Sequence, residues 1–375
     1  MTKIIVLGAG MVGSAIAVDL SKTFKVKVAD VDAVKLKRLK KYHNLETVQT
    51  DLFIPENIKH VIRDSDLIVC AVPGFMGFDT IKTVIEQSKN LVDISFFSED
   101  PFKLNKLAKK KNVTAIVDCG VAPGLSSIIL GYHNKRMNIK SFECYVGGLP
   151  KKRKLPYQYK APFSPVDVIE EYTRPARFIR NSKLVIKPAL SDIELIEFEK
   201  AGALEAFNTD GLRTLIKTMN IPNMIEKTLR YPGHIDNIKL LKETGFFNEK
   251  LVELKDGEKI RPLDLTVKLL FPLWKLKENE REFTILRVII EGQRNKKNKK
   301  IIYDLYDEFD VSTKTSSMAR TTGYTCTAAV NLVAKNIYTK KGISPPEFLG
   351  ENKACFDYIL SHLKKRNINP RIEES

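Results

Sequence analysis

The chain is poor in cysteine, with only five among its 375 residues and no Cys-x-x-Cys pair. An odd number at scattered positions argues against a disulfide framework and against a zinc site built from thiolates. We therefore expect reduced, mostly buried thiols and predict no bound metal. The cysteines are residues 70, 119, 144, 326 and 355.

Long hydrophobic runs are also missing, although 43% of the residues are hydrophobic. No stretch approaches the roughly 18 apolar residues that a membrane span needs. The first predicted strand begins at Ile4, which leaves no room for a signal peptide before it. We expect a cytoplasmic protein with no membrane partner.

Basic residues are in excess, with 62 lysines and arginines against 45 acids and a net charge of +17. The two densest basic stretches, residues 151–154 and 294–300, are not interleaved with stacking aromatics. No helix-turn-helix, zinc finger or RNA-binding motif accompanies them. A solvated basic surface and no nucleic-acid partner is the favoured interpretation, and a nucleic-acid-binding protein with a vestigial nucleotide fold is the weakest alternative.

A strand, a glycine-rich turn, a helix and a second strand follow one another over residues 4–30. Gly8 permits the tight turn after the strand, Gly10 lets the backbone approach a pyrophosphate, and Gly13 lets the helix pack closely on the strand. The free N–H groups at the start of this helix can bind a diphosphate. The pattern predicts a dinucleotide-binding βαβ unit rather than a purely structural turn.

The second strand of this unit ends in Asp30, whose carboxylate can accept hydrogen bonds from both ribose hydroxyls of an adenosine. A 2′-phosphate would meet the negative charge of this carboxylate, so we expect NAD rather than NADP. A solvated strand-end acid is the alternative, because Asp32 follows two residues later. The other expected cofactor contacts are Met11, Val12, Asp51, Ala71, Val72 and Pro73.

Strands and helices continue to alternate as far as residue 118, which is typical of a doubly wound parallel sheet of the Rossmann type. Beyond Pro123 the pattern changes to short alternating runs, which predict a second, mixed α+β domain. From Ser316 the chain becomes helical again, and we expect this tail to pack back on the nucleotide domain. The prediction is an NAD-binding domain of residues 1–122 plus about 316–375, and a second domain of residues 123–315. Six strands are expected in the first domain, at about residues 4–7, 26–30, 47–50, 67–72, 91–95 and 114–118, and five in the second, at about residues 139–146, 183–186, 203–207, 283–290 and 301–306.

Ligands of an open α/β sheet lie beyond the carboxyl ends of its strands, so the loops after Val72, Ser95 and Asp118 are candidates for the site. Ser95 places a hydroxyl at a strand end. Asp118 is suited to hold or deprotonate a cationic amine, and it is equally suited to accept backbone bonds within its own loop. His234, on a turn, is the other acid–base candidate, with a packed structural histidine as the commoner alternative.

Several long strings, in order along nearly the whole chain, carry a family resemblance: residues 8–13, 120–126, 145–150, 163–165, 170–175, 205–213, 228–234 and 320–323. On these strings the chain resembles the saccharopine dehydrogenase family, and most closely its lysine 6-dehydrogenase branch. The resemblance implies that residues 123–315 form a substrate-binding and dimerisation domain, and that the chain forms a homodimer or a higher homo-oligomer. It also implies oxidation at a carbon–nitrogen bond of lysine or of a lysine adduct.

Two departures from the family pattern bear on the substrate. Relatives that release glutamate from saccharopine resemble Gly-Leu-Asp-Pro-Gly where this chain has Ala122, and carry Asn-Arg-Asp where it has Asn208, Thr209 and Asp210. The missing arginine removes a partner for the additional carboxylates of saccharopine. Both changes favour free L-lysine, with saccharopine dehydrogenase activity or another amino- or hydroxy-acid dehydrogenase as alternatives.

The resulting hypothesis is oxidative deamination of the ε-amine of L-lysine to the semialdehyde, with NAD as hydride acceptor. Family position suggests Arg213 or Arg230 for the α-carboxylate, although either arginine could instead form a structural ion pair. The ε-amine must be neutral before the adjacent carbon releases hydride, and Asp118 or His234 is the predicted base. Substrate contacts are expected from Ser95, Asn208, Thr209, Arg213 and Arg230.

Overall fold

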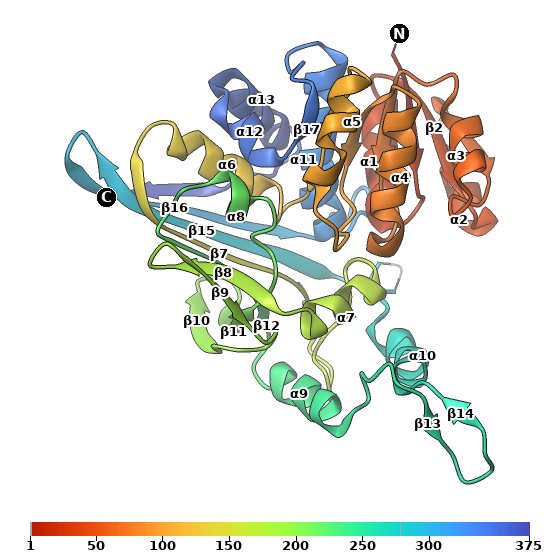
Figure 1. Ribbon diagram of the computed structural model, residues 1–375, viewed down its shortest axis with the longest axis vertical. Coiled ribbons are helices and arrows are strands. Elements are labelled where there is room, and N and C mark those ends of the chain that lie inside the picture. Colours follow the sequence, from red (N-terminus) through yellow and green to blue (C-terminus); the bar gives the residue numbers. More distant parts are fainter. Residues whose placement is uncertain (1, 278) are drawn as a thin grey trace.

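The first of two large sheets has seven parallel strands in the order β17-β6-β5-β4-β1-β2-β3. It is seen in a computed structural model that describes residues 2–277 and 279–375 (Figure 1). The predicted doubly wound Rossmann sheet is confirmed, and β17 adds a seventh strand that was not predicted. The strands are β1 (Lys3–Leu7), β2 (Lys25–Asp30), β3 (Leu45–Gln49), β4 (Leu67–Cys70), β5 (Asn90–Asp93), β6 (Thr114–Ile116) and β17 (Gly342–Ser344).

Helices cover both faces of this sheet, because successive residues of each buried strand point to opposite sides. On β1, Ile4 and Val6 belong to the core on the side of α1 and α11, whereas Ile5 and Leu7 belong to the core on the side of α3 and α4. No helix in the described part of the chain is long and apolar enough to cross a membrane. The helices are α1 (Met11–Ser21), α2 (Ala33–Leu39), α3 (Pro55–Ile62), α4 (Gly74–Glu86), the 3-10 turn η1 (Pro101–Leu104), α5 (Asn105–Lys110) and α11 (Ser317–Ala334).

The second sheet has nine strands of mixed direction, which confirms the predicted α+β character of the second half. Its main path is β10-β11-β12-β7-β15-β16-β18, with β8 beside β12 and β9 beside β8. All five strand segments predicted in this region are present, as β7, β9, β11, β15 and β16, and the other four were missed. The bounds are β7 (Asn138–Pro150), β8 (Ala176–Arg180), β9 (Lys183–Lys187), β10 (Glu194–Phe198), β11 (Gly202–Asn208), β12 (Asn223–Arg230), β15 (Glu282–Arg294), β16 (Lys297–Glu308) and β18 (Arg371–Glu374).

Further helices and a small hairpin complete the second half. In Figure 1 the β13–β14 hairpin extends away from the body, beyond α10. The central strand β7 pairs in parallel with β12 and antiparallel with β15. The elements are α6 (Leu125–Asn134), α7 (Pro165–Thr173), α8 (Leu215–Thr218), α9 (His234–Thr244), β13 (Val252–Glu253), β14 (Lys259–Ile260) and α10 (Pro262–Trp274).

The C-terminal segment contacts the N-terminal elements. Helix α11 packs against α1, β17 pairs in parallel with β6, and α13 (Lys353–Lys364) packs on α11. Helix α12 (Pro346–Glu351) packs instead against α6. Asp19 of α1 fixes this arrangement through an ion pair with Arg366, at 2.8 Å from Nη2 to Oδ2. The boundaries at residues 122 and 316 stay a prediction.

Candidate active site

A cleft of about 2410 Å³ opens at the carboxyl ends of the parallel strands and is bounded on its far side by the second sheet. All ten predicted cofactor residues line it, from the glycine turn and Asp30 to Asp51 and the loop after β4. Of the predicted catalytic and substrate residues, Ser95, Asp118, Thr209 and Arg230 line the cleft. Asn208, Arg213 and His234 are not part of its wall.

The glycine turn has the geometry that the sequence predicts. Gly8 has a φ of +108°, and a Cβ there would overlap the carbonyl oxygen of Ala71. A Cβ at Gly13 would overlap the carbonyl oxygen of Gly8, so this glycine allows α1 to start tight against the turn. Gly10 has open space around it, and no side chain caps the N–H groups at the start of α1. These residues therefore fit a dinucleotide pyrophosphate.

Asp30 is buried at the edge of the cleft and is held by two backbone donors. Its Oδ2 accepts from the N–H of Ala9 at 2.6 Å, and its Oδ1 accepts from the N–H of Asp32 at 2.8 Å. A carboxylate has about four acceptor sites, so two remain for ribose hydroxyls. Asp30 thus differs from a solvated strand-end acid. Lys35 and Arg38 of α2 line the same end of the cleft.

Asp118 and Arg213 form a buried ion pair at the end of β6. Arg213 Nη2 lies 3.0 Å from Asp118 Oδ1, and Arg213 Nη1 donates to the carbonyl oxygen of Phe97. The side chain of Arg213 is 3% exposed and lies behind the cleft wall. The geometry therefore favours the ion-pair alternative for Arg213 over a contact with a substrate carboxylate.

His234 begins α9 in an aromatic cluster and is fully buried. Its Nε2 shares a hydrogen bond of 2.9 Å with the hydroxyl of Tyr172, and its Nδ1 lies 2.7 Å from the carbonyl oxygen of Tyr157. Burial, reinforced by the nearby charge of Arg230, lowers the pKa of His234 to about 3. A neutral imidazole with both nitrogens bonded and no access to the cleft does not suit the predicted role of base.

Strand β12 presents three polar side chains to the cleft, because residues two apart lie on one face of a strand. Arg230 is one of them, and its Nη2 lies 2.7 Å from Glu171 Oε2 of α7. Thr228 is the second, and its hydroxyl lies 3.0 Å from that of Thr209. Asn208 points the other way, with its Nδ2 donating to Ser191 and Asp192.

Glu226, the third side chain on this face, was missed by the sequence reasoning. Glu226 is 5% exposed, and its side chain has no hydrogen bond to any residue that the structure describes. Burial, with the charges of Glu171 and Asp210 adding to it, raises the pKa of Glu226 to about 8. The available signal was weak: Glu226, Thr228 and Arg230 alternate along the segment as in a strand with one polar face, but Lys227 interrupts the apolar residues of the other face.

Ser95 and Asp93 form a second buried polar unit at the end of β5. The Ser95 hydroxyl lines the cleft and donates to Asp93 Oδ1, which also accepts from the backbone N–H of Ser95. Burial, followed by the charge of Asp118, raises the pKa of Asp93 to about 8. In the described residues no group of three histidine, cysteine or acidic side chains is arranged to hold a metal ion.

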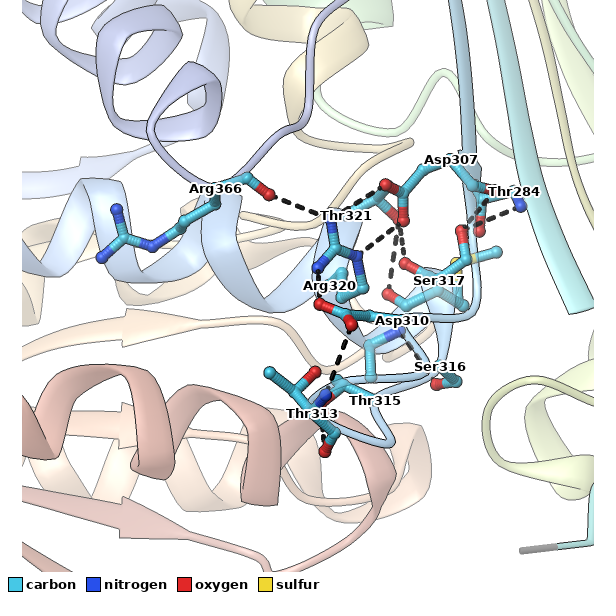
Figure 2. A network of polar contacts seen from close by, with 12 residues as sticks. Thr284, Asp307, Asp310, Thr313, Thr315, Ser316, Ser317, Arg320, Thr321 and Arg366 are labelled. Atoms are coloured by element: carbon cyan, nitrogen blue, oxygen red, sulfur yellow. Dashed lines mark hydrogen bonds and ion pairs between the residues drawn. The ribbon is translucent and has the colours of Figure 1, made fainter. Parts of the chain in front are cut away.

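A polar network fixes the loop between β16 and α11, which forms part of the cleft wall. Figure 2 shows this network. Arg320 Nε lies 3.0 Å from Asp307 Oδ2, and its Nη1 lies 3.0 Å from Asp310 Oδ2. The same guanidinium donates to the carbonyl oxygen of Arg366, which ties the loop to the C-terminal segment. Residues 312–316 of this loop line the cleft, so Arg320 positions part of its wall from behind.

Two family models match the chain in succession. Residues 4–116 match the saccharopine dehydrogenase NADP binding domain, and residues 120–368 match the saccharopine dehydrogenase C-terminal domain. Together the two matches leave only the linker at 117–119 and the two ends unmatched.

Curated relatives agree with these models at low identity. The mitochondrial alpha-aminoadipic semialdehyde synthase of Rattus norvegicus is 23% identical over 265 residues, which is 66% of this chain and 29% of the relative. The saccharopine dehydrogenase [NADP(+), L-glutamate-forming] of Pyricularia oryzae is 28% identical over 202 residues, or 50% of this chain and 45% of the relative. The matched segments thus span less than half of each relative.

Solved structures share the fold over the full chain. Apo saccharopine dehydrogenase (L-Glu forming) from Saccharomyces cerevisiae superposes with a TM-score of 0.80 at 19% identity and covers 100% of both chains. Homospermidine synthase from Legionella pneumophila in complex with NAD has a TM-score of 0.72 at 14% identity, covering 100% of this chain and 91% of that one. Because both family models lie in order along the chain, with the glycine turn in the first and the polar face of β12 in the second, the protein belongs to the saccharopine dehydrogenase family.

Proposed function

We propose that the chain is an NAD-dependent dehydrogenase that oxidises the carbon–nitrogen bond at the ε-carbon of L-lysine. The observation that carries this proposal is a single cleft with two unlike walls. One wall is the glycine turn with the open start of α1, which fits a dinucleotide. The other is the polar face of β12, with a carboxyl group at Glu226 and a guanidinium at Arg230, which suits an amino acid.

The preference for NAD rests on Asp30. Its carboxylate is held in place by the N–H groups of Ala9 and Asp32, so it cannot turn away from the ribose. A 2′-phosphate at this position would bring two further negative charges against a buried acid. The matched nucleotide-domain model and the Pyricularia oryzae relative both carry NADP in their names, so the cofactor is tested directly with both nucleotides.

The preference for lysine over saccharopine rests on the arginines of the substrate side. Arg230 is paired with Glu171, and Arg174 is paired with Glu170 at 3.0 Å. Thr209 stands where glutamate-releasing relatives carry arginine, and its hydroxyl is bonded to Thr228. Lysine has one carboxylate, whereas saccharopine has three that need cationic partners. Arg213 and Arg230 are the two arginines predicted to hold the substrate carboxylate, and of these only Arg230 lines the cleft.

The residues of the chain would act in the following way. Arg230 would orient the substrate carboxylate, and the glycine turn with Asp30 would hold the NAD whose chemistry is to accept a hydride. Asp118 lines the cleft but is occupied by the Arg213 guanidinium, so its carboxylate is suited to fix local charge rather than to accept a proton. Water entering from the open cleft then hydrolyses the imine, with release of ammonia. Homodimeric assembly and a cytoplasmic location stay predictions.

The test is a substrate panel followed by NADH or NADPH absorbance. Purified protein is incubated with each nucleotide together with L-lysine, saccharopine, or other amino and hydroxy acids. We expect NADH formation with lysine and little turnover of saccharopine. Turnover of saccharopine alone would replace this proposal with the saccharopine dehydrogenase alternative, for which the named relatives speak. Salt-sensitive nucleic-acid binding without nucleotide binding would overturn the enzyme assignment altogether.

A further inference from the structure

We infer that Glu226 binds the reacting amine of the substrate and takes its proton before the hydride leaves. This inference deepens the proposed function and rests on it, since it assigns the base at the same site. It also sets the substrate class: a primary amine at one end of a chain whose other end carries a carboxylate.

The local charge balance makes Glu226 exceptional. Each of the three carboxylates whose charges act on it has an arginine partner. Glu171 pairs with Arg230, Asp118 pairs with Arg213, and Asp210 is bound by Arg177 through two hydrogen bonds of 2.8 Å. Glu226 makes neither an ion pair nor a hydrogen bond within the described residues, although it is 95% buried. The charge of Arg213 acts on it, but that guanidinium is paired with Asp118.

An unpartnered buried carboxyl group is costly, so its retention requires a compensating partner. Glu226 lines the cleft, which means that a ligand can reach it. The backbone beside it also leaves room for its side chain, because a Cβ at Gly211 would overlap Glu226 Oε1. A carboxylate on the wall of this cleft, with other acids nearby, is the expected partner for an ammonium group.

The position of Glu226 on β12 matches the length of the substrate. Glu226 and Arg230 are four residues apart on one strand face, which separates their Cα atoms by about 13 Å. Both side chains are long and reach into the cleft, with Thr228 between them. A substrate with its carboxylate at Arg230 and its amine at Glu226 would lie along the strand. Of these three side chains, Glu226 is the one whose pKa is raised by the charge of Asp118, at the carboxyl end of β6.

The proton-transfer chemistry is consistent with this placement. The substrate ammonium gives one proton to a Glu226 oxygen, leaving a neutral amine. The C–H bond on the adjacent carbon then breaks, its electron pair passes to NAD as hydride, and a C=N bond forms to the nitrogen. Burial first, and then Glu171 and Asp210, raise the pKa of Glu226 to about 8, so the group becomes a proton acceptor as the pH rises through this value.

The test compares Glu226→Gln with a matched control, Glu143→Gln. Glu143 lies on the adjacent strand β7 opposite Ile225, so it occupies the other face of the same sheet. In Glu226→Gln we expect kcat/KM for lysine to fall by about 10²–10⁴-fold, the span of general-base catalysis. In the wild type we expect kcat/KM to rise as the pH passes through about 8, and in Glu226→Gln this rise should be absent. Glu226→Asp should recover part of the rate and keep that pH limb.

A binding experiment separates amine recognition from loss of fold or of function. In the presence of NADH, which cannot accept a hydride, titration calorimetry measures the binding of lysine and of norleucine, which has the same carboxylate and α-ammonium but no ε-amine. Glu226→Gln should weaken lysine more than tenfold while norleucine and NAD bind as in the wild type. Equal weakening of both ligands, or an unchanged pH profile with near-wild-type rate, would overturn the inference. If the wild type binds lysine without oxidising it, the proposed function fails while the amine site stands.

Discussion

Replacing Arg213 with methionine tests whether this arginine is structural or holds the substrate. In the structure Arg213 donates to both oxygens of Asp118 and to the carbonyl oxygen of Phe97, and the side chains of the ion pair are at most 3% exposed. Arg213→Met removes the cation but keeps a long apolar side chain, so little packing is lost. Asp118 is then left buried without a charged partner.

The expected cost is large because the pair is buried. Removing one partner of such a pair destabilises a protein by about 3–5 kcal/mol, since the remaining charge is uncompensated. With an unfolding entropy of about 2.1 cal/mol/K per residue, a cooperative unit of 375 residues loses about 4–6 °C in Tm. Thermal melts followed by circular dichroism measure this shift, and initial rates on the folded protein give KM.

Arg261→Met is the control, because Arg261 also pairs with an aspartate, Asp264, at 3.2 Å, but the two side chains are 48% and 61% exposed. A surface pair of this kind contributes about 0–1 kcal/mol, so the melt should barely move. Adding Asp118→Asn to Arg213→Met should recover part of the lost stability. A substrate role for Arg213 predicts the opposite pattern: a Tm within error of the wild type and a KM for lysine raised at least tenfold. That pattern would refute the structural reasoning.

Two further predictions follow from buried carboxyl groups. Asp30→Arg should raise the ratio of kcat/KM for NADP to that for NAD at least tenfold, and an unchanged ratio would remove Asp30 from the cofactor argument. Burial raises the pKa of Glu282 to about 8, so the folded state keeps a proton that the unfolded chain releases above pH 4.5. Its contribution to stability is therefore full below pH 4.5 and is lost as the pH rises towards 8. Urea unfolding across this window should show a smaller decline for Glu282→Gln than for the wild type, and equal declines would contradict the assignment.

The parallel sheet could be predicted because its signals are local. The unit of residues 4–30 contains strand, turn, helix and second strand in one short segment, and each glycine has a steric reason that the structure reproduces. Strand β17 has no such signal. It is three residues long and is defined by its pairing with β6, more than two hundred residues earlier. Pairing at that distance is not visible in periodicity.

The candidate site likewise has one part that local sequence signals predict and one part that they do not. The ten residues predicted for the cofactor all line the cleft, and six of them lie in the short segment 8–30. On the substrate wall, residue type was misleading. His234 titrates in the right range when free, but its ring bonds to Tyr172, 62 residues away. Arg213 has the right charge, but Asp118, 95 residues away, uses it. Glu226 is the opposite case. Its proposed role follows from the arginines around it, which pair with the neighbouring acids and not with Glu226.

The distribution of charge within the cleft gives these assignments a common physical basis. The chain carries a net charge of +17, yet the cleft is not uniformly basic. Its nucleotide end is lined by Lys35 and Arg38 of α2 as well as by Asp30 and Asp51, and its substrate end is lined by Glu226 as well as by Arg230. A dinucleotide diphosphate would be attracted to Lys35 and Arg38 and an ammonium group to Glu226, because opposite charges attract strongly in a partly desolvated cleft. Under the proposed function these charges would orient the two ligands, with the amine between Glu226 and the carboxyl ends of β5 and β6, next to which the nicotinamide of a Rossmann cofactor is expected.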